Sequence, residues 1–183
     1  MKKIEAGFTA PDFAIRTPWG DEGTLYELLD HGDVLILFLR YMGCPICRMK
    51  MSELARDAAD FENAGVRVLV FLQSEPGVVA KELQRDTTPF IPVCDPGGET
   101  YSLYSVEPGS VFRYITPGVI KKAIRATRMG INHGKKEGNE LQLPAMFLVS
   151  GRKIVHAYYG KNIGDLPGNN EIIALVHDFR KKQ

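Results

Sequence analysis

Two kinds of hydrophobic pattern alternate along the chain. Continuous apolar runs, typical of strands buried on both faces of a sheet, are separated by segments in which apolar residues recur every three or four positions, as on one face of a helix. The runs predict strands at residues 34–39, 66–72 and 90–93. The periodic segments predict helices at residues 24–30, 45–63, 74–84, 99–104, 116–130 and 170–182. This alternation predicts an α/β fold in which helices cover both faces of a sheet.

The last third of the chain departs from this alternation. Residues 147–149 and 153–158 flank Ser150-Gly151, which predicts a β-hairpin. Residues 130–143 hold three glycines and several polar side chains, so we expect a long loop there. A length of 183 residues fits one domain, and we expect that domain to carry a helix–loop insertion at about residues 107–143.

Composition narrows the class of protein. The 23 basic and 22 acidic residues give a net charge of +1, which argues against a nucleic-acid partner. The longest apolar run, residues 34–39, is far shorter than the roughly 20 residues of a membrane-spanning helix, so we expect no membrane partner. Three cysteines are too few for a secreted disulfide framework, and no apolar leader follows Lys2-Lys3. We therefore expect a cytoplasmic protein whose thiols are reduced.

The sharpest local signal is a C-x-x-C motif at residues 44–47. It follows a predicted strand and a short turn, and Pro45 is favourable in the first position of a helix. Cys44 is therefore expected at the helix N-cap, where unpaired backbone N–H groups and the helix dipole stabilise a thiolate. Its pKa should fall from about 8.5 toward neutrality. We expect Arg40 and Arg48 to add positive charge.

Helical phase separates the two cysteines of the motif. One apolar stripe along this helix comprises Cys47, Met51, Leu54, Ala58 and Phe61. Cys47 is thus expected on the buried face and Cys44 at the exposed tip, which is the arrangement of a dithiol redox pair. The alternative is two ordinary core cysteines. A zinc site would need further ligands such as Cys94, but there is no second C-x-x-C and no H-x₃₋₅-H, so we expect no metal.

Four segments, at residues 6–13, 43–48, 94–104 and 143–149, resemble a known family. The chain looks like the alkyl hydroperoxide reductase/thiol-specific antioxidant family, and within it the peroxiredoxin-like group that has a C-x-x-C. The resemblance implies a thioredoxin-like three-layer sandwich, in which a central mixed sheet has helices on both faces.

The same resemblance implies a chemistry. It implies a thiol-dependent antioxidant enzyme that reduces hydroperoxides, with Cys44 as the peroxidatic nucleophile, Cys47 as the resolving thiol and Pro144 as a cis-proline that lines the site. The other expected site-lining residues are Tyr41, Gly43, Pro45 and Arg48. An external thiol of thioredoxin or glutathione type is the expected reductant, no organic cofactor is implied, and a homodimer is left open.

The chain departs from the peroxiredoxin pattern P-x-x-x-T-x-x-C. Leu37 and Tyr41 stand at its proline and threonine positions, so the threonine hydroxyl that holds the peroxide is missing unless Tyr41 substitutes for it. A thioredoxin-like dithiol–disulfide oxidoreductase is therefore the alternative function. A non-catalytic thioredoxin-like binding module is more remote, because the C-x-x-C is intact.

Three further features of the sequence each allow two interpretations. Cys94 either resolves a sulfenic acid or is a core thiol. The 130–143 loop either covers the thiols or is an insertion without a role. The basic side chains of the 116–130 helix either dock a redox partner or form a solvated face; they are Lys121, Lys122, Arg125 and Arg128. Candidates from the insertion for an arginine that contacts a peroxide are Arg113, Arg125 and Arg128.

Overall fold

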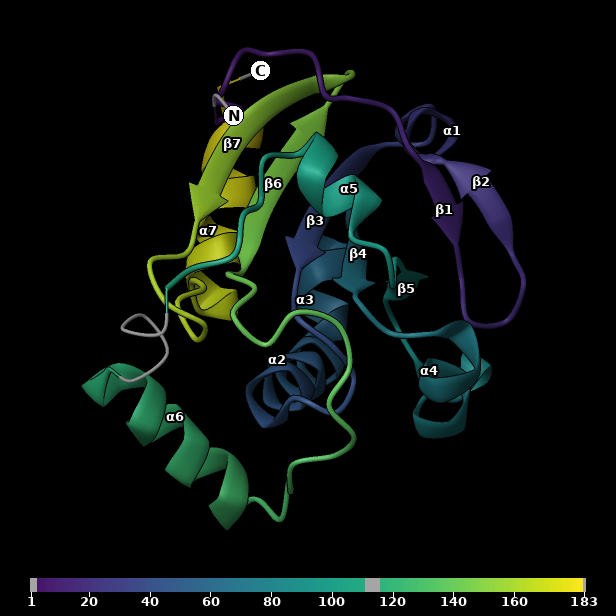
Figure 1. Ribbon diagram of the computed structural model, residues 1–183. Helices are drawn as coiled ribbons and strands as arrows, with labels where there is room; N and C mark the ends of the chain where they lie inside the picture. Colours follow the sequence, from purple (N-terminus) through teal and green to yellow (C-terminus); the bar gives the residue numbers. More distant parts are fainter. Residues whose placement is uncertain (1–2, 111–115, 183) are drawn as a thin grey trace.

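A five-stranded mixed sheet forms the centre of the computed structural model, which describes residues 3–110 and 116–182 (Figure 1). Its strands are β3 (Asp33–Phe38), β4 (Val66–Leu72), β5 (Ile91–Cys94), β6 (Ala145–Ser150) and β7 (Lys153–Tyr159). They lie in the order β5-β4-β3-β6-β7. β3, β4 and β5 are parallel, whereas β6 and β7 are antiparallel. The predicted central strand and C-terminal hairpin are confirmed.

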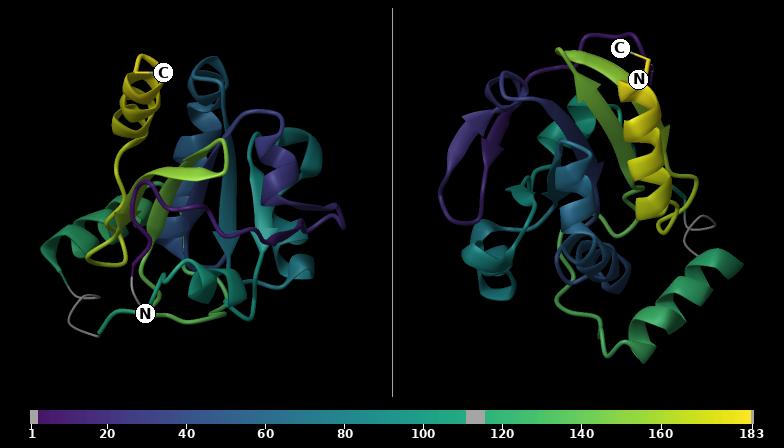
Figure 2. Two further views of the ribbon diagram at one scale, coloured as in Figure 1. Left: turned by 90° about the horizontal axis from the view of Figure 1, so that it is seen from above. Right: turned by 180° about the vertical axis from the view of Figure 1, so that it is seen from behind.

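Helices cover both faces of this sheet, as the α/β prediction requires. One face packs against α2 (Pro45–Arg56), α3 (Ala58–Asn63), α4 (Pro76–Glu82) and α7 (Asn169–Arg180). The other packs against α1 (Leu25–Leu29), α5 (Glu99–Leu103) and the N-terminal strand β1 (Ala14–Arg16). In the right-hand view of Figure 2, α7 crosses in front of β6 and β7.

The side chains of β3 show why both faces are apolar. Leu35 and Leu37 point into the core beneath α2 and α7, whereas Ile36 and Phe38 point into the opposite core. Phe38 stacks on Phe71 with ring centroids 4.7 Å apart. Each face of a central strand must be hydrophobic when helices cover both sides, which explains the continuous apolar run in the sequence.

The predicted helix over residues 45–63 is two helices, α2 and α3. The chain breaks at Asp57, whose φ of −99° and ψ of 19° are not helical. Its carboxylate accepts hydrogen bonds from the Arg56 guanidinium and from Asn169 Nδ2, at 2.7 and 2.8 Å respectively. These contacts hold Asp57 at the junction, and the bond from Asn169 comes from a residue far away in the sequence.

β1 pairs with β2 (Glu22–Thr24) in a hairpin. The sequence pattern did not predict these two strands, because each has only three residues. A single turn of 3₁₀-helix (Arg85–Thr87) follows α4.

The predicted insertion contains α6 (Pro117–Arg128), which Thr116 caps and which lies beside α2 at the edge of the molecule (Figure 1). From residue 131 to 144 the chain has neither helix nor strand, as expected, and returns across the carboxyl ends of β3 and β4. Residues 111–115, including Arg113, lie outside the described residues. Within the described residues, no helix has the length and apolar character needed to span a membrane.

Candidate active site

The C-x-x-C motif lies where β3 runs through a short turn into α2. Cys44 is the N-cap of α2, and Pro45 is its first residue, as predicted. The Cys44 Sγ accepts a hydrogen bond from the backbone N–H of Cys47 at 3.3 Å. The sulfur thus takes the place that a serine or aspartate oxygen usually takes at a helix start, and it satisfies one of the N–H groups left without a partner within the helix.

Arg40 lies in the turn between β3 and α2 and contacts both cysteines. Its Nη2 lies 2.8 Å from Cys44 Sγ, and its backbone N–H donates to Cys47 Sγ at 3.4 Å. Its Nη1 donates to the carbonyl of Glu140 at 2.6 Å. Arg40 is only 2% exposed, so its charge acts on Cys44 with little screening by water.

The two thiols differ sharply in acidity. Burial by itself raises the pKa of Cys44, but the hydrogen bond from the Cys47 thiol and the charge of Arg40 outweigh it and lower the pKa to about 6. Burial, together with the hydrogen bond that it donates to Cys44, raises the pKa of Cys47 well above its ordinary value. At neutral pH the pair therefore holds one proton, and Cys44 is the thiolate.

Cys44 is fully buried, so the expectation of an exposed helix tip is wrong. Residues 134–142, which we call the covering segment, lie over it. The Gly43 carbonyl accepts a hydrogen bond from the N–H of Gly134 at 2.9 Å. The approach is so close that a Cβ on Gly43 would lie 2.1 Å from the Lys135 carbonyl oxygen. Gly43 is needed here for space.

Side chains from the carboxyl end of β4 hold the covering segment in place. Ser74 Oγ donates to Glu137 Oε2 at 2.7 Å and accepts from the N–H of Met42 at 2.9 Å. Gln73 accepts from the N–H of Asn139 at 2.8 Å and donates to Gln142 Oε1 at 3.2 Å. The sequence analysis missed these residues. Their signal was that Gln73 and Ser74 are polar residues directly after a buried parallel strand.

Tyr41 is also buried, and its hydroxyl lies 3.3 Å from His133 Nε2. The Arg40 guanidinium lies 5.4 Å from the centre of the Tyr41 ring. Tyr41 therefore joins the turn to the residue that precedes the covering segment.

Two of the expected site residues are placed differently from the prediction. Arg48 pairs with Glu82 of α4 at 3.1 Å, on a different side of α2, and not with a thiol. No peptide bond among the described residues is cis, so the expected cis-proline at Pro144 is wrong. The Pro144 carbonyl accepts the N–H of Gly160 at 2.8 Å, so the pairing of β6 with β7 extends back to this residue in the trans form.

Cys94, at the end of β5, is 6% exposed and belongs to the core beneath α2. Burial, with a smaller effect of Glu75, raises the pKa of its thiol to about 12. Both observations fit the core-thiol interpretation. In the described part of the chain, no three His, Cys, Asp or Glu residues are grouped to hold a metal ion.

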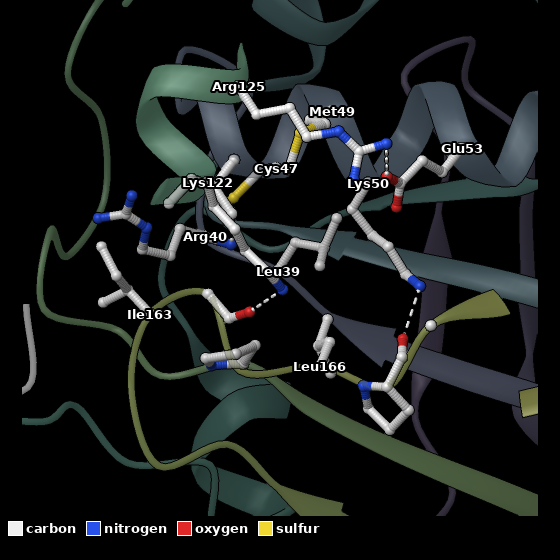
Figure 3. Close-up of a pocket in the computed structure, with 15 residues that line it drawn as sticks. Leu39, Arg40, Cys47, Met49, Lys50, Glu53, Lys122, Arg125, Ile163 and Leu166 are labelled. Carbon is white, nitrogen blue, oxygen red and sulfur yellow. Dashed lines mark hydrogen bonds and ion pairs between the residues drawn. The ribbon is translucent and has the colours of Figure 1, made fainter. Parts of the chain in front are cut away.

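A cavity of about 180 Å³ opens beside Cys47 between α2, α6 and residues 163–168 (Figure 3). Cys47, Arg40 and Pro144 are among the residues that line it, whereas Cys44 is not part of its wall. Lys122 and Arg125 of α6 also line it, so two of the four basic residues noted on that helix face the cavity beside Cys47.

A dithiol at the start of the helix that follows the central strand of a mixed sheet defines a thiol oxidoreductase of thioredoxin-like fold. The chain belongs to the AhpC/TSA family, which it matches over residues 6–158. It is therefore an oxidoreductase of the thiol-peroxidase class. No curated protein sequence matches the chain.

Solved structures share the fold at low sequence identity. Peroxidoxin BcpB from Mycobacterium tuberculosis is 14% identical, with a TM-score of 0.70 over 97% of this chain and 99% of that one. A 2-Cys peroxiredoxin from Plasmodium vivax is 13% identical, with a TM-score of 0.68 over 97% and 83% of the two chains. A protein described as thiol:disulfide interchange protein DsbE from Chlorobium tepidum is 18% identical, with a TM-score of 0.60 over 97% and 98%.

Proposed function

We propose that the protein reduces hydroperoxides through Cys44, with Cys47 as the resolving thiol. The observation that carries the proposal is the contact of the Arg40 guanidinium with Cys44 Sγ, 2.8 Å apart in a fully buried site. Together with the hydrogen bond from the Cys47 thiol, this contact lowers the pKa of Cys44 to about 6 and favours the thiolate at neutral pH. The thiolate is the nucleophilic form of cysteine.

The reaction balances within this pair and one external reductant. The Cys44 thiolate attacks the terminal oxygen of the hydroperoxide, the O–O bond breaks, and the departing oxygen takes a proton to leave as an alcohol or water. Cys44 is then a sulfenic acid. The Cys47 sulfur attacks it, water leaves, and a Cys44–Cys47 disulfide forms. Two equivalents of an external thiol reduce this disulfide and are themselves oxidised to a disulfide.

Arg40 has two parts in this scheme. Before the reaction it stabilises the thiolate, and during O–O cleavage its N–H groups lie next to the oxygen on which charge develops. Such a donor is needed because Tyr41 stands where the family has threonine. The Tyr41 hydroxyl faces His133 and is not free to replace that threonine without moving.

Access to Cys44 requires a movement. The residue has no exposed surface, so a hydroperoxide reaches the sulfur only when the covering segment shifts or when it passes Arg40 from the cavity. Hydrogen peroxide is the smallest substrate of the class and needs the smallest shift. We expect its rate constant to be lower than that of an enzyme with an open site.

The test is stopped-flow oxidation of the fully reduced protein by hydrogen peroxide, with the products identified by mass spectrometry. We expect the loss of two mass units from a Cys44–Cys47 disulfide, no reaction in Cys44→Ser, and an unchanged rate in Cys94→Ser. A wild-type rate no higher than that of Cys44→Ser would overturn the proposal.

A dithiol–disulfide oxidoreductase is the second candidate. It is favoured by the replacement of the family proline and threonine by Leu37 and Tyr41, because disulfide exchange needs a thiolate and an approach path but no peroxide-binding hydroxyl. Reaction of the reduced protein with a small disulfide, measured beside peroxide under the same conditions, separates the two functions.

The family suggests hydroperoxide substrates and thiol reductants of thioredoxin or glutathione type, and we propose both for this protein. We also propose a cytoplasmic location, in which Cys94 stays reduced, and leave a homodimer to be tested by measurement of the molar mass in solution.

A further inference from the structure

The cavity beside Cys47 is rich in positive charge. Its wall includes four cationic side chains and one carboxylate: Arg40, Lys50, Lys122, Arg125 and Glu53. Figure 3 shows these side chains arriving from the β3–α2 turn, from α2 and from α6.

Two of these cations, Lys50 and Lys122, donate hydrogen bonds to neutral groups in the cavity wall and not to a carboxylate. Lys50 Nζ donates to the Pro167 carbonyl at 3.0 Å and to Asn169 Oδ1 at 2.7 Å, and Lys122 Nζ donates to the Gly164 carbonyl. Each of these acceptors is neutral. Arg125 lies 3.4 Å from Glu53. Burial, with a contribution from Lys122, lowers the pKa of Lys50 to about 8, while Glu53 acts in the opposite direction.

The position of the cavity determines which of the two sulfur atoms a bound molecule can contact. Cys47 lines the cavity, whereas Cys44 does not and is fully buried under the covering segment. Cys47 is 3% exposed, so a group on the flat surface of another protein cannot reach it, while a small molecule in the cavity can. A molecule there meets the Cys47 side of the dithiol and a set of cations at once.

We propose that the cavity binds a small thiol that carries a carboxylate, and that this thiol reduces the Cys44–Cys47 disulfide by attack on Cys47. The proposal rests on the proposed function only in that the disulfide is the state to be reduced. The reductant's carboxylate binds among Lys50, Lys122 and Arg125, and its thiolate points toward Cys47 Sγ.

The exchange step balances. The thiolate of the small thiol attacks Cys47 Sγ, a mixed disulfide forms, the Cys44–Cys47 bond breaks, and Cys44 leaves as a thiolate. A second molecule of the thiol attacks the small-thiol sulfur, which releases the small disulfide, and the Cys47 sulfur takes up a proton. Cys44 is the better leaving group, because the thiol of lower pKa leaves faster and Arg40 is in place to receive the charge.

The test begins with the disulfide formed by diamide, so that it does not depend on peroxide. Its rate of reduction is measured with 3-mercaptopropionate, 2-mercaptoethanol and cysteamine, which carry a negative, a neutral and a positive group, and is compared per thiolate. We expect 3-mercaptopropionate to be fastest by about fivefold over 2-mercaptoethanol, cysteamine to be slowest, and added salt to reduce the difference.

Lys122→Gln and Lys121→Gln form a matched pair, because both remove one charge from α6 but only Lys122 lines the cavity. We expect Lys122→Gln to lose most of the preference for the carboxylate thiol and Lys121→Gln to keep it. Trapping of the mixed disulfide with an alkylating agent, followed by peptide mass spectrometry, should place the small thiol on Cys47 and the alkyl group on Cys44.

The inference is overturned if the small thiol is found on Cys44, if the three thiols react at one rate, or if both variants change the preference equally. If hydrogen peroxide fails to oxidise the protein while the diamide disulfide shows the expected preference, the peroxidase proposal fails and the cavity assignment stands.

Discussion

The guanidinium of Arg40 bridges Cys44 and the covering segment: one nitrogen lies 2.8 Å from Cys44 Sγ, and the other donates to the Glu140 carbonyl at 2.6 Å. The hydrogen bond from Cys47 and this guanidinium together lower the pKa of the Cys44 thiol, and the guanidinium also holds the backbone that shields the thiol. Thiolate stability and access to the thiol are coupled through this residue.

Replacement of Arg40 by Gln should slow the reaction of Cys44 with peroxide at pH 7 by at least about tenfold, or about 1.4 kcal/mol of transition-state free energy. The cause is the loss of the positive charge beside the sulfur. Arg48→Gln is the matched control, because Arg48 pairs with Glu82 and should leave the rate unchanged. Circular dichroism checks that both variants fold. Equal rates in the two variants would remove Arg40 from the mechanism.

The pH dependence of alkylation follows from the lowered pKa of Cys44, which the hydrogen bond from Cys47 and the charge of Arg40 cause. With a pKa of about 6 for Cys44, the iodoacetamide rate should rise with pH to a plateau near pH 7, while Cys47 stays protonated over this range. The measurement is the rate of modification of each cysteine between pH 4 and 10, resolved by peptide mass spectrometry. A single rise near pH 9 for Cys44 would contradict the geometry described here.

The same shift makes stability depend on pH. The pKa of Cys44 is lower in the folded protein than its ordinary value of 9.0. Between about pH 6 and 9 the unfolded thiol therefore binds a proton that the folded thiol does not, and the free energy of unfolding rises with pH. Below the folded pKa this contribution is lost. Urea unfolding of the reduced protein and of Cys44→Ser should differ in slope across this window, and parallel curves would speak against a folded-state thiolate.

Much of the site could be predicted because it is local in sequence. The N-cap position of Cys44 follows from Pro45 and the preceding strand, and the burial of Cys47 follows from its place on the apolar stripe of α2. The burial of Cys44 could not be predicted in this way. It depends on Gly134 and Glu137, roughly 90 residues away, and no periodicity indicates where a segment without helix or strand will lie.

The fold shows the same division. The strand β4 was predicted to the residue, because an apolar run between two turns fixes its ends. The break at Asp57 was not, since the hydrogen bond from Asn169 that supports it exists only after α7 packs beside α2. Elements that depend on neighbours in sequence can be predicted from the sequence, whereas contacts made by tertiary packing become known only from the structure.

The role of Cys47 is tested by Cys47→Ser. If Cys47 resolves the oxidised nucleophile, the variant should still react with one equivalent of peroxide and should then accumulate a sulfenic acid on Cys44, visible as a gain of 16 mass units or as a dimedone adduct. Cys94→Ser should form the normal disulfide. An internal disulfide in Cys47→Ser would instead identify Cys94 as the resolving thiol, despite its burial in the core.

Removal of the Glu137 carboxylate tests whether the covering segment limits access to Cys44. Glu137→Ala loses the hydrogen bond from Ser74, and a hydrogen bond to a charged group contributes about 1.5–3 kcal/mol. Alkylation of Cys44 at pH 8, where it is fully ionised, should accelerate about tenfold or more. Glu140→Ala is the control, since that side chain pairs with Lys136 while its carbonyl still binds Arg40.

The close approach of Gly43 to the Lys135 backbone gives a second and stronger test of whether the covering segment limits access to Cys44. A methyl group on Gly43 would lie 2.1 Å from the Lys135 carbonyl oxygen, and backbone on both sides leaves no flexible side chain to move away. Gly43→Ala should therefore displace the covering segment and expose Cys44 without altering its helix cap. We expect faster alkylation and peroxide oxidation than in the wild type, and a new proteolytic cut within residues 134–142. Gly77→Ala, at a position with open space around the added methyl group, should change neither property. If Gly43→Ala instead folds with an unchanged alkylation rate, the segment does not control access, and the hydroperoxide must reach Cys44 through the cavity beside Cys47.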